Sequence, residues 1–158
     1  MNILDRFSLE GKIALITGGA GFIGSALVRH IIRHTPDAVV NVDKLTYAGN
    51  LSNLTALAGD GRHVFVKGDI LDSELISQLL AEHDINAIMH LAAESHVDRS
   101  IDGPEEFIMT NFVGTFRLLD AAQKHHQARL AEGKDDFRFL HVSTDEVYGT
   151  LSASDPAF

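Results

Sequence analysis

Two adjacent carboxylates, Asp145 and Glu146, directly follow the hydroxyl residue Thr144. Neighbouring carboxylates can take opposite roles in proton transfer when their surroundings separate their pKa values, so that one is protonated and the other ionised. Acid–base chemistry is therefore one interpretation of this segment. An Asp-Glu pair also occurs in ordinary surface loops, so its meaning depends on where the fold places it.

A glycine-rich segment, TGGAGFIG, spans 17–24 and has glycines at positions 18, 21 and 24. In a dinucleotide-binding turn, Gly18 permits the tight turn, Gly21 lets a pyrophosphate approach the backbone, and Gly24 lets the next helix pack closely. Free N–H groups at the start of that helix suit phosphate oxygens. The spacing differs from the standard GxGxxG fingerprint, and a glycine-rich turn without a ligand is the alternative.

Acidic residues at two further predicted strand ends bear on the nature of the ligand. Asp43 ends the second predicted strand, where a carboxylate accepts hydrogen bonds from ribose hydroxyls and repels a 2′-phosphate. This favours NAD over NADP, although Lys44 beside it would soften the repulsion and Asp43 alone would also suit a turn. Asp69 follows the third strand, where it would face the adenine amino group or cap the next helix.

The elements that must position these residues alternate between strand and helix. Apolar runs predict strands over 12–17, 39–42, 63–67, 87–91 and 137–142. Helical spacing, which includes Phe22, Ile23 and Ile31, predicts helices over 22–34, 72–83 and 104–129, with a short one near 51–57. The alternation predicts an α/β, Rossmann-like doubly wound parallel sheet in the order 3-2-1-4-5, whose ligands bind beyond the carboxyl ends of the strands.

Composition limits the remaining possibilities. The chain has 158 residues, 45% of them hydrophobic, a formal charge of −9 and no cysteine. One domain is expected over 12–158, a NAD-binding domain preceded by an N-terminal extension over 1–11. The acidic balance disfavours nucleic acid and anionic membranes as partners. The absence of cysteine excludes disulfides and thiolate catalysis and fits a cytoplasmic protein.

Several motifs together resemble the extended short-chain dehydrogenase/reductase family. They are TGGAGFIG at 17–24, LAAESHVDRS at 91–100 and TNxxGT at 110–115. Within the family, HVSTDEVYG at 141–149 resembles the signature of nucleoside-diphosphate-sugar 4,6-dehydratases, the dTDP-glucose 4,6-dehydratases in particular. The stretch DKLTYAGN at 43–50 is similar to the same group.

The resemblance implies a lyase that converts dTDP-glucose to dTDP-4-keto-6-deoxyglucose with tightly bound, recycled NAD. It implies that the sugar is oxidised at C4, loses water across C5 and C6, and is reduced at C6. Glu146 would remove the C5 proton as general base, and Asp145 would protonate the departing C6 hydroxyl as general acid. Thr144 would bind the sugar near C4, and Ser95 would lie between cofactor and substrate.

The cofactor site implied by the same resemblance consists of turn and strand-end residues. These residues are Gly18, Gly21, Phe22, Ile23, Gly24, Asp43, Lys44, Leu45, Thr46, Asp69, Ile70, Leu91, Ala92, Ala93, Ser95 and Thr110.

One family feature is missing from the chain. The oxidation step uses a Tyr-x-x-x-Lys pair, but the two tyrosines here are Tyr47 and Tyr148, and Ser152 stands where the lysine of the second would be. We therefore expect the N-terminal part of such an enzyme, without the sugar-nucleotide domain and without turnover of its own. A related epimerase or decarboxylase, or a non-catalytic NAD-binding module, are the alternatives; the Asp-Glu pair argues against the first.

The long predicted helix and the histidines bear on partners and metals. The helix from Pro104 resembles one that pairs in family homodimers, but its apolar residues Phe107, Val113 and Leu118 would equally suit the core. The nine histidines include close pairs at 30/34 and 125/126, and no third ligand accompanies either. Solvated helix histidines are the better interpretation, so no metal is expected.

Overall fold

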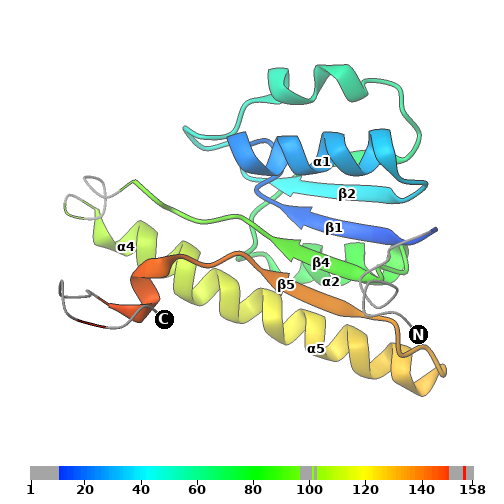
Figure 1. Cartoon of the computed structure of the whole chain (residues 1–158). Helices are drawn as coiled ribbons and strands as arrows, with labels where there is room; N and C mark the ends of the chain where they lie inside the picture. Colours follow the sequence, from blue (N-terminus) through cyan, green and yellow to red (C-terminus); the bar gives the residue numbers. More distant parts are fainter. Residues whose placement is uncertain (1–10, 97–100, 102, 150–154, 156–158) are drawn as a thin grey trace.

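The computed structural model describes residues 11–96, 101, 103–149 and 155 (Figure 1). Within them lies a five-stranded sheet in the order β3-β2-β1-β4-β5. All four pairings are parallel, which confirms the predicted topology. The strands are β1 (Ile13–Thr17), β2 (Ala38–Asp43), β3 (His63–Lys67), β4 (Ala87–His90) and β5 (Arg138–His141).

The strand register brings the strand ends that carry the predicted site residues to one edge of the sheet. Thr17 of β1 is opposite Val42 and His90, Asp43 is opposite Lys67, and His90 is opposite His141. Because every strand runs in the same direction, the glycine turn, Asp43 and the segments after β3 and β4 all leave the sheet at this carboxyl edge. The opposite edge holds the strand starts.

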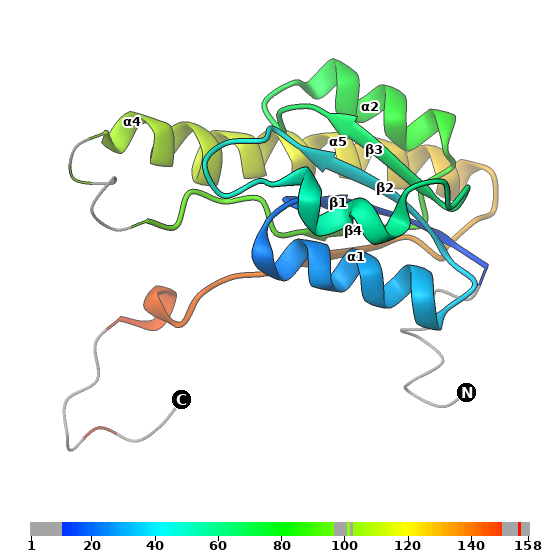
Figure 2. The same cartoon turned by 90° about the horizontal axis from the view of Figure 1, so that it is seen from above.

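Helices cover both faces of the sheet (Figures 1 and 2). One layer contains α1 (Phe22–His34) and the 3₁₀ helix η2 (Leu51–Leu57), and the other contains α2 (Ser73–Glu82) and α5 (Thr115–Ala131). Alternate residues of β1 enter different cores: Ala14 and Ile16 pack with α1, and Leu15 packs with α2 and α5. Burial on both faces explains why β1 is a continuous apolar run rather than an alternating one.

The buried face of α1 includes only part of the apolar residues that recur at helical spacing. Its fully covered apolar residues are Val28, Ile31 and Ile32, whereas Phe22 is 90% and Ile23 is 66% exposed. The helix predicted over 22–34 is confirmed, and its first turn is the exposed end. That turn stands beyond the carboxyl edge of the sheet, where no strand lies beneath it.

The long helix after Pro104 is not uniform. It begins as α4 (Pro104–Phe107), continues as the π-helix η3 (Ile108–Gly114) and becomes α5. The prediction of one helix over 104–129 was right in extent and missed the π segment. Gly114 lies against Ile70 so closely that a Cβ there would be 2.6 Å from its Cδ1. No described helix is both long and apolar enough to cross a membrane.

Candidate functional site

A pocket of about 310 Å³ opens at the carboxyl edge, between the glycine turn and the segments that follow β2, β3 and β4. Its lining consists of Gly18, Gly21, Phe22, Ile23, Gly24, Val42, Asp43, Lys44, Thr46, Ala48, Gly49, Gly68, Asp69, Ile70, Leu91, Ala92, Ala93, Glu94, Ser95, Thr110 and Val142. The residues implied for the cofactor site are thus brought together, apart from Leu45. The roles assigned to them stay predictions.

Leu45 and the proposed catalytic segment lie outside the pocket lining. Leu45 has a φ of 58° and packs against the core on the side of α1. Thr144 follows β5 and is exposed. The backbone of Asp145 and Glu146 forms the start of the 3₁₀ helix η4 (Asp145–Tyr148), and their side chains lie outside the described part of the structure.

The glycine turn depends on two close backbone approaches. Gly18 has a φ of +73°, and a Cβ there would be 2.8 Å from the backbone nitrogen of Ala92. A Cβ on Gly24 would be 2.1 Å from the carbonyl oxygen of Gly18. Both contacts involve backbone atoms that cannot turn away, so any side chain would displace the turn. This explains the predicted need for glycine at both positions.

The start of α1 offers unsatisfied donors to the pocket. No described side chain caps this helix, and its first turn contains no acidic residue. By contrast, α2 is capped by Asp72, whose carboxylate accepts a hydrogen bond from the Leu75 N–H at 3.0 Å. The first N–H groups of a helix have no intrahelical acceptor, so those of α1 face the pocket with the positive end of the helix dipole.

Asp43 is fixed beside that helix start and is only 8% exposed. One carboxylate oxygen accepts the Ala20 N–H of the glycine turn, and the other accepts the Leu45 N–H, both at 2.8 Å. Each oxygen keeps a second lone pair. Asp43 therefore ties the glycine turn to the end of β2 and still presents an oriented acceptor to the pocket.

The segment after β4 is held by the π-helix. Asn111 accepts the Glu94 N–H with its amide oxygen and donates to the Glu94 carbonyl, both at 2.8 Å. Thr110, one residue earlier, lines the pocket. The π-helix thereby aligns two successive residues with the segment that carries Ser95.

His90 joins three elements beneath the pocket. Its Nδ1 is 2.7 Å from the Thr17 hydroxyl, and its Nε2 is 2.9 Å from the Thr115 hydroxyl. The Thr17 hydroxyl also accepts the Ala92 N–H at 3.2 Å, which leaves its proton for Nδ1. Burial, and then the nearby His141, lower the pKa of His90 to about 4, so the ring is neutral at pH 7.

Sequence reasoning missed several residues of this region. Gly49, Gly68 and Val142 line the pocket, and His90 supports it from below. A polar residue inside an otherwise apolar strand was the available signal for His90. Among the described residues, no group of three or more histidines or carboxylates is arranged to hold a metal.

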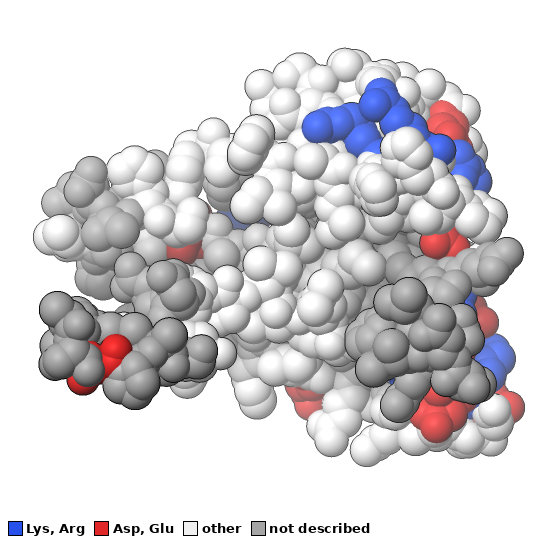
Figure 3. All heavy atoms as spheres, in the orientation of Figure 1, with Lys and Arg blue, Asp and Glu red and all other residues white. Residues whose placement is uncertain are grey.

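Basic side chains are scarce around the pocket. In Figure 3 most of the Lys and Arg atoms of the visible face gather on the side of α1, and others lie at the end of the molecule where the strands start. Among the described residues, Lys44 is the single cation of the pocket lining, against the carboxylates Asp43, Asp69 and Glu94. A bound pyrophosphate would therefore depend on backbone N–H groups rather than on side-chain cations.

The family model described as GDP-mannose 4,6 dehydratase matches residues 15–157. The chain belongs to this family. It is 59% identical over 144 residues to the dTDP-glucose 4,6-dehydratase of Neisseria meningitidis serogroup B, a match that covers 91% of this chain and 41% of that protein. This confirms the resemblance to dTDP-glucose 4,6-dehydratases. The chain thus spans about two fifths of the length of such relatives.

Two solved structures share the architecture of this chain. The Streptomyces venezuelae dTDP-glucose 4,6-dehydratase with NAD bound has a TM-score of 0.75 and 44% identity, covering 90% of this chain and 42% of its own. The UDP-glucose 4-epimerase of Thermotoga maritima has a TM-score of 0.74 and 30% identity, covering 92% and 42%. The fold alone therefore does not separate dehydratase from epimerase.

Proposed function

We propose that residues 12–158 form the NAD-binding domain of a dTDP-glucose 4,6-dehydratase, with 1–11 as an N-terminal extension. The observation that carries the proposal is the uncapped start of α1 beside the fixed carboxylate of Asp43. Helix N–H groups suit the pyrophosphate, and the carboxylate suits the ribose hydroxyls. The close approaches at Gly18 and Gly24 keep side chains out of the space where the dinucleotide would lie.

The whole protein would convert dTDP-glucose to dTDP-4-keto-6-deoxyglucose with tightly bound NAD that is recycled. Bound NAD supplies reversible hydride transfer, which oxidises the sugar at C4 and later reduces it at C6. Glu146 would accept the C5 proton and Asp145 would donate a proton to the C6 hydroxyl. Thr144 would hydrogen-bond the sugar near C4, with Ser95 between sugar and nicotinamide. The position of this segment after β5, at the carboxyl edge, supports these roles.

Calorimetric titration of the chain with NAD tests the cofactor proposal. We expect saturable binding that Gly24→Ala reduces at least about tenfold, because its methyl group would displace the glycine turn. Gly61→Ala is the matched control, since a Cβ at Gly61 meets no atom within 4 Å. Absence of NAD binding to the folded chain would contradict the proposal.

A chimera tests the catalytic roles. Residues 12–149 would replace the matching segment of the Neisseria meningitidis relative, to which this chain is 59% identical. We expect dehydration of dTDP-glucose, reduced by about 10²–10⁴-fold in both Glu146→Gln and Asp145→Asn. An epimerised sugar product would instead assign the segment to an epimerase.

We also propose that the whole enzyme is a cytoplasmic homodimer that binds neither membrane nor nucleic acid. Among the residues first considered for pairing, Leu118 is fully buried in this chain's own core. The exposed apolar row on the same helix is Ile108, Phe112, Phe116 and Leu119. In the chimera, Phe112→Glu is expected to convert a dimer to a monomer in sedimentation velocity, whereas Leu130→Glu is not.

A further inference from the structure

Lys44 and Asp69 form an ion pair at the mouth of the pocket, with Lys44 Nζ 2.8 Å from Asp69 Oδ2. Lys44 follows β2 and Asp69 follows the neighbouring strand β3, whose last residue is opposite Asp43. Both residues line the pocket. The pair thus bridges two neighbouring strand ends beside the carboxylate that is proposed to receive the ribose.

The Asp69 carboxylate is held in place by a second contact besides Lys44. Its other oxygen, Oδ1, accepts the Leu71 N–H at 3.0 Å. Among the described residues, Asp69 is the one carboxylate in ion-pair contact with Lys44. The hydrogen bond to Asp69 raises the pKa of Lys44, and the charges of Glu106 and Glu94 act in the same direction. The Lys44 ammonium is therefore charged and is paired with a carboxylate whose position is fixed.

The charges of the pocket lining make the pairing of Lys44 with Asp69 important for the choice of ligand. Of the residues that the structure describes, its lining holds three carboxylates, Asp43, Asp69 and Glu94, and one cation, Lys44. NADP differs from NAD by a phosphate of nearly two negative charges on the adenosine ribose. That phosphate would meet the Asp43 carboxylate, while the positive charge of Lys44 is already offset by Asp69.

Resting on the proposed NAD site, we propose that the Lys44–Asp69 ion pair sets the choice between NAD and NADP, because it withholds from a 2′-phosphate the one cation that the described residues contribute to the pocket lining. Asp43 supplies the repulsion, and Asp69 prevents Lys44 from cancelling it. Asp69 is thus a specificity-determining residue that acts through Lys44. Any contact of Asp69 with adenine would affect NAD and NADP alike and would cancel in the ratio of their affinities.

Calorimetric titrations of NAD and NADP into four forms of the chain test the proposal: wild type, Asp69→Asn, Lys44→Met and the double variant. Asn at position 69 keeps an acceptor for the Leu71 N–H and loses the charge. We expect Asp69→Asn to shift the NADP-to-NAD affinity ratio toward NADP by about tenfold, the size of one well-placed surface charge pair. Lys44→Met alone should leave the ratio within about twofold of wild type.

The double variant separates the proposed mechanism from simple repulsion. If Asp69 acts through Lys44, adding Lys44→Met to Asp69→Asn abolishes the gain for NADP. An equal gain with and without Lys44 would mean that Asp69 repels the phosphate directly, and would overturn the proposal. No change in the ratio with Asp69→Asn would also overturn it.

A matched control is the exposed pair of Asp120 and Lys124 on α5, with 2.7 Å between charged atoms. Asp120→Asn should not alter the ratio. If none of the folded proteins binds NAD, the proposed cofactor site itself is wrong. If NAD binds and the ratio is insensitive to Asp69→Asn, only the specificity inference fails.

Discussion

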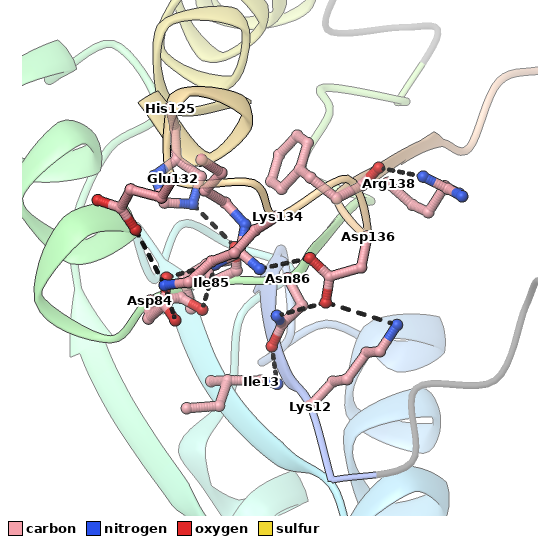
Figure 4. A network of polar contacts seen from close by, with 12 residues as sticks. Lys12, Ile13, Asp84, Ile85, Asn86, His125, Glu132, Lys134, Asp136 and Arg138 are labelled. Carbon is pink, nitrogen blue, oxygen red and sulfur yellow. Dashed lines mark hydrogen bonds and ion pairs between the residues drawn. The ribbon is translucent and has the colours of Figure 1, made fainter. Parts of the chain in front are cut away.

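The two edges of the sheet use polar groups in opposite ways. At the carboxyl edge, the helix α1 is uncapped and the turn before it excludes side chains. At the amino edge, charged side chains bind one another in a network that joins the strand starts to the end of α5 (Figure 4). Asp37 directly precedes β2, and Asp43 is its last residue. The two carboxylates illustrate the difference between the edges.

The amino-edge network is centred on Arg129, whose side chain is 4% exposed and pairs with Asp84 and Asp136. Asp136 also accepts from the Asn86 amide at 3.1 Å and is 3.7 Å from Lys12 Nζ. Burial raises the pKa of Asp136, but the hydrogen bond from Arg129 and the positive charges of Arg129 and Lys12 together outweigh burial, so that pKa lies below its usual value. The terminal guanidinium nitrogens of Arg129 are thus paired with carboxylates of the same network, whereas its buried Nε has no hydrogen-bond partner among the described residues.

Polar groups at the amino edge therefore stabilise the fold, whereas those at the carboxyl edge are kept available for binding. Substitutions at the two edges should therefore separate stability from affinity. The following predictions test that separation, beginning with the largest expected change in the free energy of unfolding.

Arg129→Met should lower the free energy of unfolding by about 3 kcal/mol, because it removes charge-assisted hydrogen bonds from a buried position. NAD affinity should stay within about twofold. Urea denaturation and calorimetric titration measure the two quantities. Lys124→Met on the same helix is the control, since its exposed i,i+4 pair contributes only about 0.3–0.5 kcal/mol. A large loss of affinity in folded Arg129→Met would show that the edges are coupled.

The neutral ring of His90 should make stability fall as the pH falls. Its pKa is about 4 in the folded chain, against 6.5 for an unperturbed histidine. Between these values the unfolded chain binds a proton that the folded chain does not, so stability is present above pH 6.5 and lost toward pH 4. The full loss is up to about 3 kcal/mol. His90→Gln should remove this part of the pH dependence in urea denaturation series; identical slopes would contradict it.

Asp43→Asn should affect both quantities, because the carboxylate holds the glycine turn and faces the pocket. We expect a loss of about 1–2 kcal/mol in stability, since one oxygen that accepts a backbone N–H is replaced by a donor. NAD affinity should fall about tenfold. The matched control is Asp37→Asn at the other end of β2, where the carboxylate accepts the Lys12 N–H at 3.2 Å. Asp37→Asn should leave NAD affinity unchanged.

Gly21→Ser should have the smallest effect on stability and a distinct effect on binding. Gly21 is the N-cap of α1 with a φ of −74°, which any residue adopts. A serine hydroxyl can cap the free N–H groups, so stability should change by only a few tenths of a kcal/mol. Binding of NAD should weaken at least about tenfold, because the donors are then occupied. Unchanged affinity would argue against a role for these N–H groups.

The sequence predicted the carboxyl edge better than the amino edge for a physical reason. The glycine turn and Asp43 belong to one local strand–turn–helix unit, so their spacing is visible along the chain. Arg129 meets Asp84 across 45 residues, and His90 meets Thr17 across 73, which no local period records. The π-helix also escaped prediction, because it depends on the fit of Gly114 against Ile70 and of Asn111 against Glu94.

The most direct test is an NMR titration of the isotope-labelled chain with NAD, following the backbone amide signals. We expect changes in amide chemical shift to be concentrated at Gly18–Gly24, with smaller changes at 43–46 and 68–70 and none at 84–86 or 129–138. Shifts centred on the Arg129 network, or saturable binding with the glycine-turn amides unmoved, would contradict the claim that the carboxyl edge is the binding edge.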